Sequence, residues 1–313
     1  MPLFTRNYPR LDLFRKVSRY LLEKKMNSLT RAHAIRRRQL AVFSFDYISV
    51  QVILDGLYEI DELEMFTQWL SSLGDRNIFD GAAVDVGANI GNHSLYFSDY
   101  FSEVLSFEPH PLTYKLLSVN AELAANVKCF NCGLSSTAGT AALVLDGKNM
   151  SGARIVKNAD GEAASIRLET LDSTVGEADD KAVRLIKIDV EGHEVEVLAG
   201  ARATIRKHQP IILFEQHPSD FANGSNRAIE LIKSYGYQNF ACIEKFPRLP
   251  NYLPGALRSP LTAVMRLLMG SSRRIAKMDE FKPRFYPYII AIPAWLDEQI
   301  RAQAALSLNR TPL

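Results

Sequence analysis

The chain has 313 residues, of which 47% are hydrophobic and 23% charged, a composition that excludes a disordered or fibrous protein and leaves room for about two domains. The sequence has no run of 18 apolar residues, which argues against a membrane-spanning helix, and it has no cleavable leader pattern. Its three cysteines are too few for a disulfide-stabilised secreted protein, so we expect a cytoplasmic one. The net charge of +2 hides a basic segment 1–41 (+9), a basic segment 245–284 (+7) and an acidic central region 42–244 (−14).

Residues 1–41 are predicted to form a basic, helical N-terminal extension. The run LDLFRKVSRYLLEKK interleaves apolar and cationic side chains, a pattern typical of helices on an anionic membrane surface. The same segment would also suit packing against the acidic region. That region begins a single predicted domain, which covers residues 42–313. Peripheral membrane contact and packing within the protein therefore remain two alternatives.

From Ala82 onward, short β-branched runs alternate with helical patterns, which predicts βαβ units in a doubly wound α/β domain. Strand AAVDVG precedes helix NHSLYFSDYF, strand EVLSFEP precedes helix PLTYKLLSVNAELAAN, and VKCFNCGLS supplies a third strand. The next two segments, TAALVLD and ASIRLETLD, alternate in polarity and indicate a local hairpin.

The second half of the domain continues the same alternation. VRLIKIDV has the near-continuous apolar character of a central buried strand, with one basic interruption. Helix EVEVLAGARATIRKH, strand PIILFEQHP, helix NRAIELIKSYG, strand YQNFACIE and a final strand PYIIAIP follow, which makes a sheet of about seven strands. Residues 245–284 interrupt this pattern before the last strand and are predicted to be a basic cap or partner surface, with PLTAVMRLLMGSSRR as a second candidate for membrane contact.

The turn after the first predicted strand is a candidate ligand site. Open α/β sheets bind nucleotide-like ligands at this position. Asn89 takes the place of the second glycine of a dinucleotide fingerprint, which disfavours a pyrophosphate ligand. Glu108 ends the second strand 21 residues after Gly87, where a carboxylate can bind ribose hydroxyls. Both features predict an adenosine-type ligand bound by Asp85, Gly87, Ala88, Asn89, Gly91, Asn92, Glu108 and Pro109.

Acidic and imidazole side chains follow the fourth and fifth strands of this pattern. Asp189 ends the most apolar strand and is the candidate general base, with Glu215 and His217 beside it as further catalytic candidates. Two alternatives stay open: Asp189 accepts hydrogen bonds only from its own turn, or the three side chains hold Mg²⁺ or Mn²⁺, although no diagnostic metal-ligand spacing is present. His93 fits a helix surface, and Cys129 and Cys132 fit buried thiols that pack the sheet.

Several of these motifs together resemble the FkbM family of methyltransferases. VDVGANIGNHS, LSFEPHP, NCGLSSTAG, LIKIDVEGHEVEVLAGA and IILFEQH occur in the family's order, and the resemblance covers roughly residues 42–242. It implies a Rossmann-like methyltransferase fold of seven strands, S-adenosyl-L-methionine as the cofactor, and O-methylation of an alcohol on a sugar, glycan or other secondary metabolite. The basic segments lie outside the resemblance.

Three other functions compete with this interpretation. A nicotinamide-dependent oxidoreductase is disfavoured by Asn89, and a non-catalytic nucleotide-binding protein would not need Asp189. Nucleic-acid methylation would suit the basic segments, but no Asn-Pro-Pro-Tyr motif follows a strand. We therefore expect a small-molecule or glycan hydroxyl acceptor, and the basic segments favour an anionic one.

Overall fold

The computed structural model describes residues 12–33, 39–44, 46–145, 153–156, 164–175, 181–222, 225–247 and 271–308. The chain divides into two compact units, 1–58 and 59–313. The charge pattern changes after residue 41, but the boundary between the units comes later, after residue 58. The reason is that α2 (Tyr47–Asp55) makes contacts with α1 (Asp12–His33) and belongs to the same unit. Within the N-terminal segment, the described residues Asp12–His33 form the helix that the sequence predicts.

Helix α1 presents side chains to solvent on every face. All residues from Phe14 to Ser28 are exposed, including the apolar Phe14, Leu21 and Leu22. Within the described part of the chain, no helix has the length and apolarity needed to cross a bilayer.

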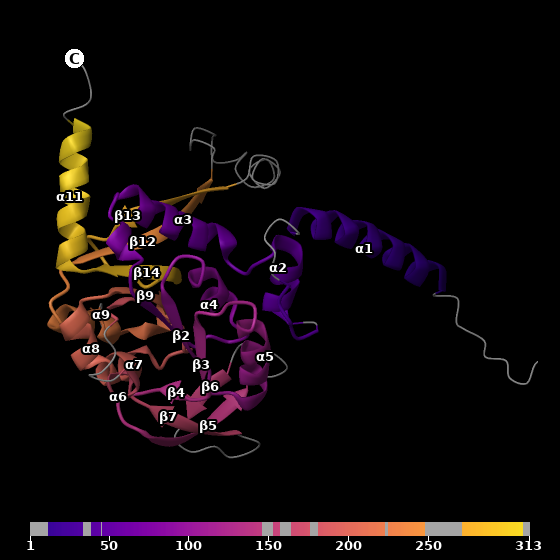
Figure 1. Cartoon of the computed structure of the whole chain (residues 1–313), viewed down its shortest axis with the longest axis horizontal. Coiled ribbons are helices and arrows are strands. Elements are labelled where there is room, and N and C mark those ends of the chain that lie inside the picture. Colours follow the sequence, from indigo (N-terminus) through magenta and orange to yellow (C-terminus); the bar gives the residue numbers. More distant parts are fainter. Residues whose placement is uncertain are drawn as a thin grey trace, which may run out of the picture. The chain divides into compact units, whose positions relative to one another are not determined.

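The second unit is built on a mixed sheet in the order β13-β12-β14-β9-β8-β1-β2-β3 (Figure 1). Strands β3, β2, β1, β8 and β9 are parallel, and β14 runs antiparallel to both β9 and β12. The strands are β1 (Ala82–Val86), β2 (Glu103–Phe107), β3 (Val127–Phe130), β8 (Val183–Ile188), β9 (Ile211–Gln216), β12 (Asn239–Pro247), β13 (Ser271–Lys277) and β14 (Tyr286–Ile292).

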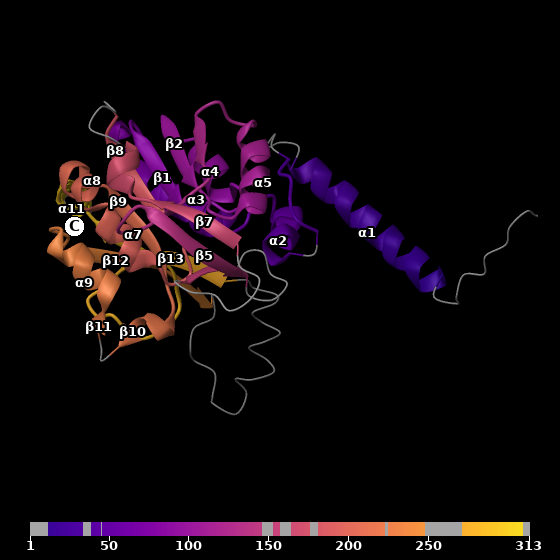
Figure 2. The same cartoon turned by 90° about the horizontal axis from the view of Figure 1, so that it is seen from below.

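The direction of chain progression reverses between β1 and β8, so right-handed crossovers place helices on both faces of the sheet. Helices α4 (Asn92–Phe97) and α5 (Pro111–Ala121) cover one face, while α7 (Glu194–Gly200), α8 (Arg202–His208) and α9 (Arg227–Ser234) cover the other (Figure 2). Helix α3 (Ile60–Ser72) precedes β1, and α11 (Ala294–Leu308) follows β14. The expected doubly wound, Rossmann-like α/β fold is confirmed.

The central strands are buried along their whole length, which explains their near-continuous apolar sequences. Val84, Ile186 and Ile212, from three adjacent strands, are all fully buried in one core. Helix α5 starts where it was predicted, because His110 caps it and Pro111 occupies its first turn. The positions of the strand ends, and hence of the site, follow from this core.

Two predicted elements are divided in the structure. The helix predicted over EVEVLAGARATIRKH is α7 followed by α8, with the non-helical Ala201 between them. The preceding Gly200 lies so close to Ser135 that an added Cβ would come within 1.9 Å of the Ser135 carbonyl oxygen. The third predicted strand is likewise β3 in the main sheet and β4 (Gly133–Leu134) in a second one. The two segments of the expected hairpin, β5 (Gly139–Leu145) and β7 (Ala164–Glu169), do pair antiparallel. They are not consecutive strands, however, because β6 (Ala153–Val156) lies between them in the sequence and pairs with the other side of β5, which gives this second sheet the order β4-β7-β5-β6.

The segment 245–284 is partly sheet and not only a cap. Strand β12 continues into it as far as Pro247, and β13 returns antiparallel to β12 with Pro247 opposite Ser271. The sequence did not predict β13, since five of its seven residues are polar or charged and it lies at a sheet edge. Most of PLTAVMRLLMGSSRR falls within 248–270, outside the described residues.

Candidate active site

The turn between β1 and α4 lies at the carboxyl edge of the sheet, where the strand order reverses. Gly87, Asn89 and Gly91 all have positive φ angles. A Cβ on Gly87 would lie 1.9 Å from the carbonyl oxygen of Asp189, and one on Gly91 would lie 2.9 Å from Leu117. Both glycines are therefore required by the close approach of other parts of the fold, whether or not a ligand is bound.

The loop offers only part of its surface to a ligand. Gly87 and Asn89 are half-buried, whereas Ala88, Gly91 and Asn92 are buried beneath them. Of the residues predicted to bind the cofactor in this turn, Gly87 and Asn89 are thus the ones with exposed surface. The others shape the loop.

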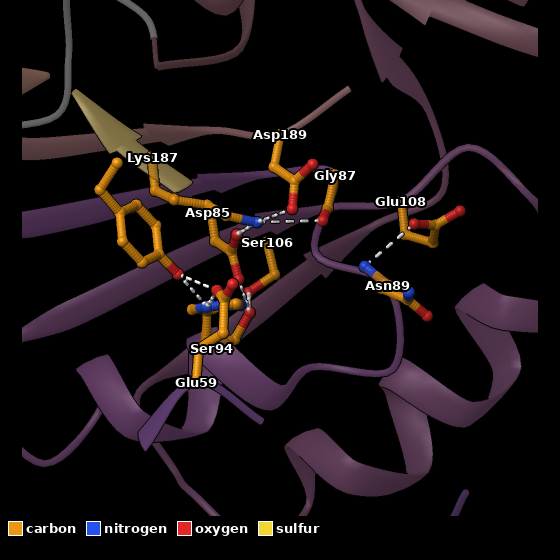
Figure 3. Close-up of polar contacts among 11 residues, drawn as sticks. Glu59, Asp85, Gly87, Asn89, Ser94, Ser106, Glu108, Lys187 and Asp189 are labelled. Carbon is orange, nitrogen blue, oxygen red and sulfur yellow. Dashed lines mark hydrogen bonds and ion pairs between the residues drawn. The ribbon is translucent and has the colours of Figure 1, made fainter. Parts of the chain in front are cut away.

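Glu108 follows β2 at the same edge and is buried, with 7% of its surface exposed. One carboxylate oxygen accepts a backbone hydrogen bond from Asn89 at 3.0 Å (Figure 3), and the other accepts one from His110 at 2.8 Å. Burial raises the pKa of Glu108 to about 7, and the two amides and Lys187 limit the rise. The carboxylate is thereby linked directly to the turn of Asn89, as the predicted adenosine pocket requires, and Pro109 lies half-buried next to it.

Asp85 lies below the edge. It is fully buried, accepts a hydrogen bond from the Ser94 hydroxyl at 2.6 Å, and its other oxygen lies 3.2 Å from the Lys187 ammonium. Ser94 in turn accepts a hydrogen bond from Ser106 at 2.8 Å. The contacts of Asp85 are thus internal ones that position Lys187 and α4.

Lys187 is the residue of this site that the sequence analysis missed. It is 1% exposed, and its ammonium lies 3.2 Å from Asp85 and 3.5 Å from Asp189, with a 3.3 Å hydrogen bond to the Gly87 carbonyl. Burial alone would lower the pKa of Lys187, but the two carboxylates raise it above its ordinary value. The signal was the single basic residue in LIKIDV, since a buried ammonium needs a partner.

Asp189 and Glu215 form a carboxyl pair at the ends of β8 and β9. Their side chains are hydrogen bonded to each other and are 35% and 23% exposed. Burial opposes the ionisation of both, but the charge of Lys187 lowers the pKa of Asp189, while burial and the Asp189 charge raise that of Glu215. The charge of Lys187 thus favours the ionised form of Asp189, and Glu215 is the member of the pair that keeps its proton to higher pH.

His217 lies at the margin of this pair. Its side chain is 44% exposed, its Nε2 atom lies 3.6 Å from Glu215, and its ring is 5.2 Å from that of Phe285. Among the residues that the structure describes, no group of three or more His, Cys, Asp or Glu side chains is arranged to hold a metal ion. The structure therefore brings Asp189 and Glu215 together and leaves His217 beside them.

Next to the carboxyl pair lies a cluster of three side chains from distant segments. His93 Nε2 lies 2.7 Å from the Tyr288 hydroxyl and 3.4 Å from Glu59, and Tyr288 donates a hydrogen bond to Glu59. His93 is 5% exposed, so its expected place on a helix surface was wrong. The reason is that every residue of the short helix α4 is buried.

The three cysteines are free, as expected. Cys132 and Cys242 are buried, Cys129 is half-buried on β3, and burial raises the pKa of each thiol. None of them has the lowered pKa of a reactive thiol.

Comparison with known proteins shows which family this chain resembles. Residues 85–238 match the family model described as the methyltransferase FkbM domain. Methyltransferase sdnD of Sordaria araneosa is 34% identical over 152 residues, which covers 37% of this chain and 59% of that protein. Hexuronic acid methyltransferase AglP of Haloferax volcanii is 33% identical over 124 residues, which covers 39% of this chain and 50% of that protein. The chain thus matches roughly half to three fifths of the length of these curated relatives.

Among solved structures, a methyltransferase FkbM from Methylobacillus flagellatus is similar at 18% identity with a TM-score of 0.36, covering 77% of this chain and 57% of that one. A putative O-methyltransferase from Klebsiella pneumoniae is 10% identical with the same TM-score, covering 71% and 89%.

Proposed function

Since the chain belongs to the FkbM methyltransferase family by its match over residues 85–238, we propose that it transfers a methyl group from S-adenosyl-L-methionine to a hydroxyl of a sugar, glycan or other secondary metabolite. The observation that carries this proposal is one edge of the sheet at which the turn of Gly87 and Asn89, the carboxylate of Glu108 and the Asp189–Glu215 pair all meet. The free cysteines agree with activity in the cytoplasm, which is part of the same proposal.

The residues at this edge fit an adenosine-containing cofactor. Glu108 accepts one amide on each oxygen, which leaves further lone pairs for two ribose hydroxyls. Asn89 has a left-handed backbone conformation and is half-buried. It stands at the position where a pyrophosphate ligand would need a glycine for close contact with the backbone. This arrangement favours S-adenosylmethionine over a nicotinamide dinucleotide.

The acceptor chemistry requires a base. When bound, S-adenosylmethionine supplies an electrophilic methyl group on its sulfonium. Asp189, ionised by its contact with Lys187, accepts the proton of an acceptor hydroxyl at its exposed side. Glu215, protonated, donates to Asp189 and keeps that carboxylate oriented. Lys187 stays fixed by Asp85 and the Gly87 carbonyl, so it positions the base without touching the acceptor.

This function predicts that Glu108→Gln weakens binding of S-adenosylmethionine and of its demethylated product by about 1–3 kcal/mol, because a charge-assisted bond to ribose is lost. Isothermal titration calorimetry on the full chain measures both affinities. The matched control is Glu103→Gln, at the opposite end of β2, where the carboxylate is also 7% exposed but pairs with Lys128. Equal loss in both variants, or binding of a nicotinamide dinucleotide in place of either sulfur compound, would overturn the proposal.

A further inference from the structure

A cavity of about 420 Å³ lies among the starts and ends of β12, β13 and β14. Its wall includes Glu244 and Lys245 from β12, Arg273 from β13, and Arg284, Phe285 and Tyr286 at the start of β14. None of these residues takes part in the adenosine pocket or the carboxyl pair described above. The cavity is therefore a separate feature of the same unit.

The cavity adjoins the carboxyl edge of the sheet. Tyr286 lies opposite Gln216 in the β14–β9 pairing, and Gln216 follows Glu215 directly. The ring of Phe285, which lines the cavity, lies 5.2 Å from that of His217. A molecule in the cavity would thus lie one strand away from the Asp189–Glu215 pair.

The charges on the β12 side of the cavity are unequal. Glu244 accepts hydrogen bonds from two guanidinium groups, from Arg284 at 2.8 Å and from Arg274 at 3.0 Å. Lys245, which also lines the cavity, is exposed, and no carboxylate of a described residue forms an ion pair with it. On the other side, Arg273 is held by Asp61 at 2.6 Å and Glu62 at 2.7 Å, so its charge is already compensated.

An aromatic surface accompanies this positive charge. Phe285 is 49% exposed, and the Arg284 guanidinium lies over the Tyr286 ring at 4.6 Å, which orients its remaining donors. An exposed ring offers a flat apolar surface, and a guanidinium offers a planar pair of donors suited to carboxylate or phosphate. These two elements match a small ring compound that carries an anionic group.

We propose that this cavity binds the methyl acceptor, and that the acceptor is a sugar-like hydroxyl compound with a carboxylate or phosphate group. Arg284 and Lys245 bind the anionic group, Phe285 covers a face of the ring, and a hydroxyl is directed toward Asp189. This inference rests on the proposed methyltransferase function and names its substrate class.

Three probes that differ only at one carbon test the inference: 4-nitrophenyl β-D-glucoside, its 6-phosphate and the corresponding glucuronide. Binding to the full chain is measured by saturation-transfer NMR titration, and methyl transfer by mass spectrometry. We expect one or both anionic probes to bind about tenfold more tightly than the glucoside, and the better of the two identifies the group. Equal binding of all three probes, or no binding, would overturn the inference.

The matched variants are Arg284→Gln and Arg274→Gln. Each removes one guanidinium from Glu244, but only Arg284 lines the cavity. Arg284→Gln should abolish the preference for the anionic probes, whereas Arg274→Gln should retain it, and both should bind S-adenosylmethionine normally. Identical behaviour of the two variants contradicts the assignment of Arg284. If the unmodified chain does not bind S-adenosylmethionine, the methyltransferase function itself is contradicted. Failure of the acceptor assignment can therefore be distinguished from failure of the proposed function.

Discussion

At the scale of single residues, Lys187 organises the candidate active site. Its buried ammonium lies between Asp85 on β1 and Asp189 at the end of β8, and it also holds the Gly87 carbonyl. A buried charge of this kind is stable only while its partners remain ionised. The contact explains why Asp189 stays a carboxylate next to Glu215, and it links the base to the cofactor turn.

Asp189→Asn should slow methyl transfer by about 10²–10⁴-fold while leaving cofactor affinity unchanged, because the base is lost but the turn of Gly87 is retained. Single-turnover methyl transfer, calorimetry and the thermal midpoint give the three readouts. Unchanged turnover would refute the role of Asp189 as the base. A lower midpoint with normal specific activity in the folded fraction would assign it a structural role instead.

Glu215→Gln is the control for this prediction. A glutamine amide donates a hydrogen bond to Asp189 as the protonated Glu215 carboxyl does, so most activity at neutral pH should remain. If Glu215→Gln is inactive and Asp189→Asn is active, the roles of the two carboxyl groups are reversed.

At the scale of elements, helix α1 has several exposed apolar side chains. Six basic and two acidic residues share the helix with exposed Phe14, Val17, Leu21 and Leu22. Amphipathic cationic helices of this kind bind anionic bilayer surfaces by burying the apolar face and attracting the lipid charge. We therefore propose that α1 contacts a membrane without crossing it.

The full chain is expected to sediment with phosphatidylserine-containing vesicles at low salt and less so at high salt. Leu21→Glu should strongly reduce sedimentation because it places a charge on the apolar face, whereas Asn27→Glu adds the same charge on the polar face and should have a smaller effect. Binding that does not depend on anionic lipid, or an equal effect of both substitutions, would contradict the electrostatic model.

At the scale of the whole molecule, buried carboxyl groups make stability depend on pH. Burial raises the pKa of Glu108 and of Glu194 to about 7, and each residue is 7% exposed. The folded protein therefore binds these two protons more tightly than the unfolded chain, whose carboxyls titrate near pH 4.5. The free energy of unfolding should consequently decrease as pH rises from about 4.5 to about 7.

Removing the two groups isolates this effect. In the double variant Glu108→Gln, Glu194→Gln, the loss of stability between pH 5 and pH 8 should be smaller than in the unmodified chain by an amount on the order of a few kcal/mol. Urea unfolding at both pH values, without cofactor, measures the difference. The double variant must be compared with the unmodified chain because three histidines, His110, His193 and His208, also change stability with pH. Their pKa values are lowered in the folded protein, so below pH 6.5 they make stability increase as pH rises. Parallel pH profiles for the two proteins would refute the prediction.

The sequence alone determined the doubly wound domain and the edge at which its site lies. Buried parallel strands need continuous apolar runs, and the turn after β1 needs small residues, so local pattern was sufficient for AAVDVG, VRLIKIDV and IILFEQH. It was also sufficient to place Glu108 and Asp189 at strand ends.

Only the tertiary structure decided which charged groups are partners. Asp85 and Lys187 lie on adjacent strands in a register that no local pattern contains, and His93 meets Tyr288 from 195 residues away. Strand β13 was likewise found only through its pairing with β12. Apolar burial is non-directional and is encoded by periodicity along the chain, whereas an ion pair or a hydrogen bond depends on distances of a few ångströms between segments that folding alone brings together.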